Sequence, residues 1–171
     1  MKFLQFIFQD WTSNKGNIKA RIILVFFRLC HLLSTRNKII FVLAIPILIL
    51  YRIIVEWMLC VEIPFRTKIG SCLRLYHGQA LVINNQAIIG NNCTLRHSTT
   101  IGNNKEVRDG GNSGCPIIGN NVDIGCNSVI IGPITIGNNV VIGAGSVVVK
   151  DIKSSSKVVG NPARIIDATT V

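Results

Sequence analysis

Residues 118–148 read IGNNVDIGCNSVIIGPITIGNNVVIGAGSVV, and a branched apolar residue returns at every sixth position. The repeated positions are Ile118, Ile124, Ile130, Ile136, Ile142 and Val148, and Gly follows most of them. Neither a helix, with 3.6 residues per turn, nor an alternating strand produces a period of six. The period therefore predicts a solenoid, in which each hexad forms a short strand and turn and buries its apolar residue only by stacking on its neighbours.

The hexads extend towards the N-terminus as far as Ile63. Further repeat positions are Ile63, Ile69, Leu75, Leu81, Ile89, Leu95 and Ile101. The intervals from Leu81 to Ile89 and from Ile101 to Ile118 are longer than six, so the extra residues are predicted to be extruded as loops. The second interval, residues 102–116, is rich in Gly, Asn and charge and is predicted to be an external loop.

Residues 1–61 have a different character. Between Met1 and Val55 there are eight Lys or Arg against the single acid Asp10, and much of the rest is apolar. We expect a helix over 17–33 and a second apolar segment over 39–51, which is too short to cross a bilayer because a span needs roughly 20 residues. Three interpretations stay open: a helical hairpin in the membrane interface, a helical domain buried in an oligomer, and a true span.

Charge and cysteine usage exclude several classes of protein. The net charge is +10, and its concentration in a basic and apolar segment favours an anionic membrane surface over nucleic acid. The six cysteines form no C-x-x-C pair, so neither a metal site nor a disulfide framework is predicted. The first ten residues lack the features of a signal peptide. We therefore expect a cytoplasmic protein at the inner face of a bacterial cytoplasmic membrane.

Two stretches resemble the hexapeptide-repeat acyltransferases. LYHGQALVI at 75–83 looks like the active-site coil of serine O-acetyltransferases, and IGAGSVV at 142–148 with VGNPAR at 159–164 looks like the closing coil and tail of coenzyme A-dependent members. Acetyltransferases of exopolysaccharide and capsule clusters, including the colanic acid type, are similar as well. The resemblance covers about residues 62–166.

The resemblance implies a mainly β fold, a left-handed parallel β-helix with three hexads per coil. We expect an N-terminal α-helical segment over 1–61 and a catalytic domain with a C-terminal tail over 62–171. The family's members form homotrimers, and some form higher oligomers, with the active site between two subunits.

Three hexads per coil also set a register. Leu75, Leu95, Ile124 and Ile142 are predicted to stack at one corner, and two positions further on the column reads His77, His97, Cys126 and Ala144. Because coils lie about 4.8 Å apart, the column is roughly 14 Å long. That length is similar to the reach of a pantetheine arm.

The resemblance makes His77 the catalytic base, which takes the proton of an acceptor hydroxyl as its oxygen attacks the thioester of acetyl-CoA. An imidazole suits this task because its pKa lies near neutrality. Glu62 matches the acidic partner of the base, and its alternative role is that of a solvated residue. His97 is expected either to orient the substrate or simply to face the groove.

The acetyl-CoA site is implied in the same way. The positions of Cys126, Gly143 and Ala144 flank the pantetheine arm, and Lys150 and Arg164 match cations that neutralise its phosphates. No metal takes part.

The sequence differs from the serine O-acetyltransferases at positions that bind serine in those enzymes, and these differences indicate another acceptor. Tyr76 stands where those enzymes have an acid, and Gly114-Cys115 replaces the Arg-His pair that receives the serine carboxylate. Arg108 and Asp109 in the external loop are further candidates for substrate contact, with Tyr76 and Cys115. We therefore predict an O-acetyltransferase acting on a sugar hydroxyl in surface polysaccharide biosynthesis. L-Serine is the alternative acceptor, and a non-catalytic, membrane-attached β-helix assembly protein is the alternative of another class.

Overall fold

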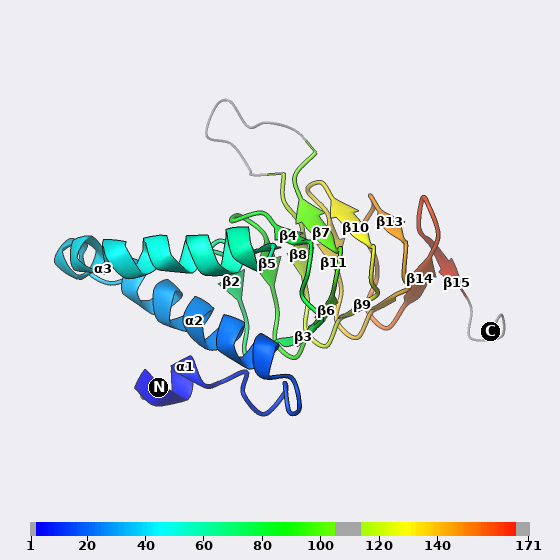
Figure 1. The fold of residues 1–171 in the computed structure, drawn as a ribbon. Coiled ribbons are helices and arrows are strands. Elements are labelled where there is room, and N and C mark those ends of the chain that lie inside the picture. The colour runs from blue at the N-terminus through cyan, green and yellow to red at the C-terminus, as the bar shows by residue number, and fades with distance from the viewer. Residues whose placement is uncertain (1–2, 105–113, 167–171) are drawn as a thin grey trace.

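The computed structural model describes residues 3–104 and 114–166 and consists of a helical part followed by a stack of short strands (Figure 1). The helical elements are α1 Phe3–Ile7, α2 Ile18–Ser34, α3 Lys38–Tyr51 and the π-helix η1 Arg52–Met58, which continues α3. Both longer helices begin at an asparagine N-cap. The side-chain oxygens of Asn17 and Asn37 accept hydrogen bonds from the backbone N–H groups of Ala20 and Ile40.

The strands form three sheets, and from β1 to β13 consecutive strands belong to different sheets, so the chain passes over three faces in each coil. The first face contains β1 Val61–Glu62, β4 Leu81–Ile83, β7 Thr100–Gly102, β10 Val129–Ile131 and β13 Val147–Val148. The second contains β2 Lys68–Ile69, β5 Ile88–Ile89, β8 Ile117–Ile118 and β11 Thr135–Ile136. The third contains β3 Arg74–Tyr76, β6 Thr94–Arg96, β9 Asp123–Ile124, β12 Val141–Ile142, β14 Lys157–Val159 and β15 Arg164–Ile166. Pairing is parallel except between β14 and β15, which confirms the predicted parallel β-helix.

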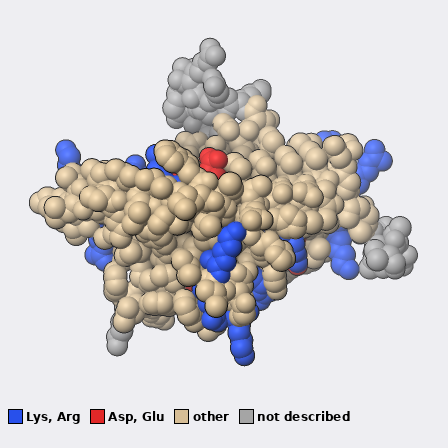
Figure 2. Space-filling view, in the orientation of Figure 1, with Lys and Arg blue, Asp and Glu red and all other residues tan. Residues whose placement is uncertain are grey.

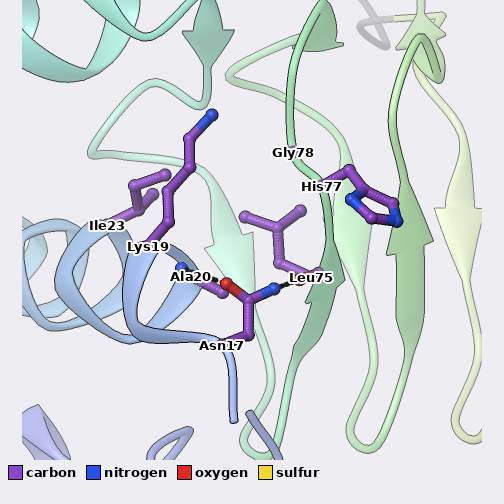
Figure 3. A pocket seen from close by; sticks show the side chains of 7 residues that line it. All are labelled: Asn17, Lys19, Ala20, Ile23, Leu75, His77 and Gly78. Atoms are coloured by element: carbon purple, nitrogen blue, oxygen red, sulfur yellow. Dashed lines mark hydrogen bonds between the residues drawn. The ribbon is translucent and has the colours of Figure 1, made fainter.

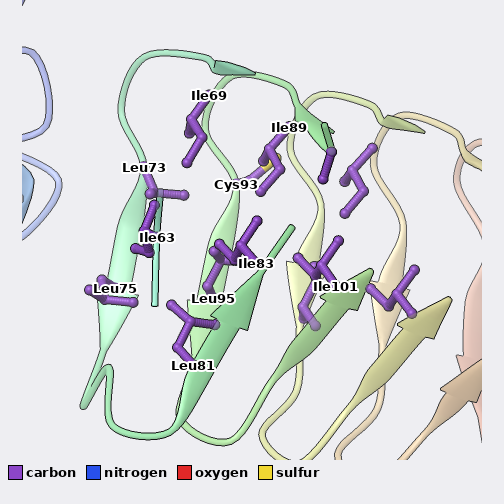
Figure 4. Close-up of a cluster of buried hydrophobic side chains, with 14 of the residues drawn as sticks. Ile63, Ile69, Leu73, Leu75, Leu81, Ile83, Ile89, Cys93, Leu95 and Ile101 are labelled. Atoms are coloured by element: carbon purple, nitrogen blue, oxygen red, sulfur yellow. The ribbon is translucent and has the colours of Figure 1, made fainter. Parts of the chain in front are cut away.

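The repeated aliphatic residues fill the interior of the helix (Figure 4). The Gly that follows many of them is needed where successive coils approach closely. A Cβ atom at Gly90 would lie 2.4 Å from the carbonyl oxygen of Gly119, a distance that no relaxed structure permits. The hexad pattern thus encodes both the buried side chain and the tight corner beside it.

The strand pairs test the predicted register. Leu75 pairs with Leu95 and Ile124 pairs with Ile142, and β6 pairs with β9 between them, so the predicted stack is confirmed. It lies on the third face rather than at a corner. The expected extrusion after Leu81 is wrong, because Ile83, not Leu81, pairs with Ile101. Leu81 and Ile83 are both buried, and Val82 between them points outward. Leu81 therefore fits the apolar pattern as well as Ile83 does, and it was assigned to the repeat position.

The extra residues instead lengthen the turn that contains His77. Tyr76 is aligned with Arg96 and Val82 with Thr100, so this turn crosses from the third face to the first in six residues rather than four (82 − 76 against 100 − 96). The next coil shows the shorter form of the same turn. The candidate base therefore lies on a turn with two inserted residues.

The segment before α2 covers the open edge of the first coil. The backbone N–H groups of Leu73 and Leu75 donate to the side-chain oxygens of Asp10 and Asn14 at 2.8 and 3.0 Å. The Asn14 amide in turn donates to the carbonyl oxygen of Leu73 at 2.8 Å. An uncovered edge strand would leave these groups without partners or open to another chain.

A buried ion pair fixes the same junction. Arg28 in α2 donates from Nε to Asp10 Oδ2 at 2.7 Å, and the two side chains are only 2% and 3% exposed. Its other nitrogens donate to the carbonyl oxygens of Ile69 and Gly70 at 2.7 and 2.6 Å. Helices and β-helix also share one apolar core. The N-terminal part is thus an integral cap of the coil that carries His77.

The outer face of α3 is apolar and exposed. Lys38–Met58 contains 21 residues and is long and apolar enough to cross a membrane, judged by length and composition alone. Figure 2 shows a broad uncharged face with Lys and Arg at its margins. The large exposed apolar residues of this segment are Ile39, Val42, Leu43, Ile45, Ile49, Leu50, Ile53, Trp57 and Met58. The apolar segment expected over 39–51 is thus part of a longer helix, because η1 continues α3 to Met58.

Candidate active site

His77 follows β3 in the lengthened turn, with its side chain exposed. Its φ is +64° and that of Gly78 is +56°, so both residues adopt the left-handed region. The Gly78 N–H donates to the Tyr76 carbonyl oxygen at 2.8 Å and tightens the turn. The turn thus presents the imidazole outward, as a base acting on a diffusing acceptor requires.

The ring of His97 stands beside that of His77. The ring centroids are 5.8 Å apart and the planes meet at 76°. His97 is half-buried, and its Nδ1 is a buried atom with no hydrogen-bond partner among the described residues. This nitrogen is thus an unsatisfied buried polar atom beside the candidate base.

The predicted column continues beyond the two histidines. The Asn127 N–H donates to the His97 carbonyl oxygen at 3.1 Å, and the Gly145 N–H donates to the Cys126 carbonyl oxygen at 2.8 Å. These bonds stack the turns of His97, Cys126 and Ala144 on successive coils. Ala144 is exposed and Gly143 half-buried, so the far end of the column is lined by small groups.

A neighbouring cluster was not predicted. The Arg96 guanidinium lies 5.5 Å from the centroid of the Tyr76 ring and forms an ion pair with Asp123. Its Nη1 also donates to the Ile124 carbonyl oxygen at 2.9 Å, and the hydrogen bond that Arg96 donates to the Asp123 carboxylate raises the pKa of Arg96. The signal was available, because Tyr76 and Arg96 each follow a residue of the Leu75–Leu95 pair and must project outward together.

The start of α2 forms one wall beside His77 (Figure 3). A small, open hollow is lined by Asn17, Lys19, Ala20 and Ile23 from α2 and by Leu75, His77 and Gly78 from the β-helix. The Asn17 side chain joins the two walls, because it accepts from the Ala20 N–H and donates to the Leu75 carbonyl oxygen, both at 3.0 Å. A second hollow on the same side is lined by Lys19, His77 and Gln79, with Gly16, Asn17 and Ile18.

No described contact joins the other predicted catalytic and acceptor-binding residues to the candidate base. Glu62 is exposed on β1, and its carboxylate has no hydrogen bond or ion pair with another described residue. Cys115 is 7% exposed and belongs to the apolar core. Arg108 and Asp109 lie outside the described residues. Substrate contacts by these residues stay predictions.

Lys150 and Arg164 are brought together at the C-terminal end. Both are exposed, and they line one hollow with Val149, Ile152 and Pro162. Such a pair of cations suits the phosphates of a nucleotide. In the described part of the chain there is no group of three or more His, Cys, Asp or Glu side chains that could hold a metal ion.

Comparison with known proteins agrees with this geometry. The model of the family described as "Bacterial transferase hexapeptide (six repeats)" matches residues 115–150. An Escherichia coli (strain K12) protein named "Putative colanic acid biosynthesis acetyltransferase WcaB" is 38% identical over 160 residues, which cover 92% of this chain and 96% of that protein. The chain belongs to the hexapeptide-repeat acetyltransferases. The prediction of an O-acetyltransferase is therefore confirmed at the level of the family.

Serine acetyltransferases are also similar to this member. "Serine acetyltransferase 1, chloroplastic" of Arabidopsis thaliana is 39% identical over 141 residues, which cover 81% of this chain but 41% of that protein. The solved soybean serine acetyltransferase apoenzyme has a TM-score of 0.75 at 28% identity and covers 95% of this chain and 68% of its own. Its coverage includes the helical part as well as the β-helix.

Proposed function

We propose that this hexapeptide-repeat acetyltransferase transfers the acetyl group of acetyl-CoA to a sugar hydroxyl in surface polysaccharide biosynthesis. The observation that carries the proposal is the outward His77 at one end of a column that finishes at the small residue Ala144. The relative named for colanic acid biosynthesis matches nearly the whole chain, which supports a saccharide acceptor.

The chemistry follows from the column. His77 accepts the hydroxyl proton while the acceptor oxygen bonds to the thioester carbonyl carbon, and the carbonyl electrons move onto its oxygen. When the tetrahedral intermediate collapses, the carbon–sulfur bond breaks and the imidazolium returns its proton to the departing thiolate. Backbone N–H groups are the usual donors to the transient oxyanion. No covalent enzyme intermediate is required.

Coenzyme A is proposed to lie along the column, flanked by Cys126, Gly143 and Ala144, with Lys150 and Arg164 at its phosphates. Ala144→Trp fills this groove from an exposed position, so the variant should stay folded and bind coenzyme A more weakly. Isothermal titration measures the dissociation constant. Unchanged affinity would place coenzyme A elsewhere.

L-Serine is the second candidate acceptor, because serine acetyltransferases are among the relatives. Free serine needs partners for both its charges, since burying either one unpaired is costly. Tyr76 and the buried Cys115 offer neither. We therefore expect coenzyme A to be released from acetyl-CoA faster with sugar glycosides than with L-serine at equal concentration. The reverse order would make serine the acceptor, and no transfer to any hydroxyl would favour a non-catalytic assembly protein.

We further propose a homotrimer that rests on the anionic inner face of a bacterial cytoplasmic membrane. The exposed apolar face of α3 and the cationic N-terminal segment support the membrane contact. Ile39 and Leu43 are 72% and 76% exposed, so replacing both by Ser removes apolar contact without disturbing the core.

Vesicles that contain phosphatidylglycerol test the membrane contact by co-sedimentation. The intact protein should sediment, the Ile39→Ser/Leu43→Ser variant should sediment less, and Ile165→Ser should behave as wild type because this exposed residue lies on β15. An intact protein that ignores vesicles and is monodisperse without detergent would make α3 an oligomer interface.

A further inference from the structure

Lys19 is the cation that the structure places beside the candidate base. It lies in the first turn of α2, is half-buried, and lines both hollows that His77 lines. Figure 3 shows its side chain running along the first of these hollows, between the helix and the coil of His77. The sequence does not predict that Lys19 lies near His77, because Lys19 is far from the repeats along the chain and the hexads do not specify where α2 packs.

The charge of Lys19 has no partner among the described residues. Neither hollow is lined by an Asp or Glu. Asp10 and Asp123 have other cationic partners, since Asp10 pairs with Arg28 and Asp123 pairs with Arg96. The ammonium of the half-buried Lys19 thus has no carboxylate from these residues, and it can pair with an anion that enters the hollows.

We propose that Lys19 binds a carboxylate or phosphate group of the acceptor, so that the substrate is an anionic sugar whose hydroxyl faces His77. The inference rests on the proposed function and narrows it to uronic acids and sugar phosphates. An ammonium is a flexible point charge that suits either group. Free serine fits less well, because its own ammonium would lie near Lys19 with no acid lining the hollows.

The test compares charge selectivity. Acetyl-CoA is supplied with p-nitrophenyl β-D-glucuronide, glucose 1-phosphate or the neutral p-nitrophenyl β-D-glucoside, and kcat/KM is measured for each. The variants are Lys19→Gln, which removes the charge, Lys19→Arg, which keeps it, and Lys15→Gln. Lys15 is an exposed lysine of the same segment that lines neither hollow, so it serves as the matched control.

Wild type and Lys15→Gln should prefer an anionic acceptor to the neutral glucoside, and Lys19→Gln should reduce this preference about ten-fold, the usual effect of one charge-assisted hydrogen bond. Lys19→Arg should retain most of the preference. If kcat/KM falls more for the glucuronide than for glucose 1-phosphate when Lys19 is replaced by Gln, the group that is bound is a carboxylate. The opposite order identifies a phosphate.

Two results overturn the inference in different ways. Equal use of neutral and anionic sugars by wild type and Lys19→Gln would show that Lys19 is merely solvated, and it would leave the sugar acetyltransferase intact. Failure of transfer to all three sugars, with efficient acetylation of L-serine, would overturn the proposed function and this inference together.

Discussion

Replacing Arg28 by Met should destabilise the protein severely, because the substitution leaves buried polar groups without partners. The guanidinium donates four hydrogen bonds, two to the Asp10 carboxylate and one each to the carbonyl oxygens of Ile69 and Gly70. Breaking a buried pair by removing one partner costs about 3–5 kcal/mol of the free energy of unfolding. For a chain of this size, about 2–4 °C of Tm is lost per kcal/mol, so Tm should fall by about 6–20 °C.

The assay is thermal and urea unfolding followed by circular dichroism at one fixed protein concentration, since association would make Tm depend on concentration. Arg52→Met is the matched control. Arg52 pairs with Glu56 at 3.1 Å, but its side chain is 63% exposed. Such a pair contributes about 0–1 kcal/mol.

A second variant separates the charge from the contacts. Adding Asp10→Asn to Arg28→Met removes the stranded carboxylate and keeps an acceptor for the Leu73 N–H, so it should recover part of the lost stability. A loss for Arg28→Met no larger than that for Arg52→Met would refute the reasoning. It would mean that the N-terminal segment does not cap the first coil.

Two further predictions concern the β-helix corners and the cysteines. Gly90→Ala should lower Tm clearly, because its Cβ would lie 2.4 Å from a backbone oxygen of the next coil. A Cβ at Gly102 meets no atom of the described residues within 4 Å, so Gly102→Ala should change Tm little. Equal effects would contradict the close-packed corner. Burial raises the pKa of the Cys30 thiol to about 12, so Cys30 should resist iodoacetamide at pH 8, whereas the exposed Cys60 should react. The native protein is labelled, and peptide mass analysis then shows which cysteine is modified. Rapid labelling of Cys30 would mean that α2 opens readily.

The sequence predicts the β-helix well because each hexad carries its own signal. The stack of Leu75 on Leu95 followed from the hexad spacing together with the three hexads per coil that the family resemblance implied, and it is observed. The position of the two inserted residues was missed, because Leu81 and Ile83 are both buried and either one satisfies the pattern. A sequence period identifies a repeat, but it does not show which of two neighbouring apolar residues takes the buried repeat position.

The candidate site was predictable only in part, for a similar reason. His77, His97 and Ala144 lie on the repeats, so their alignment follows from the register. Lys19 belongs to a helix whose packing depends on single contacts, such as the bond from Asn17 to the Leu75 carbonyl oxygen. No periodic pattern encodes such contacts, so the sequence did not predict that Lys19 lines a hollow with His77.

The turnover of His77→Asn decides whether His77 is the base of the acetyl transfer. Asn tolerates the left-handed backbone at this position but cannot accept the proton, so the turn should keep its form. With acetyl-CoA and a sugar acceptor, kcat should fall by about 10²–10⁴-fold, the usual contribution of a general base, while coenzyme A binding and Tm stay unchanged. A kcat within a few-fold of wild type would contradict the account, and a loss confined to His97→Asn would assign the base to His97.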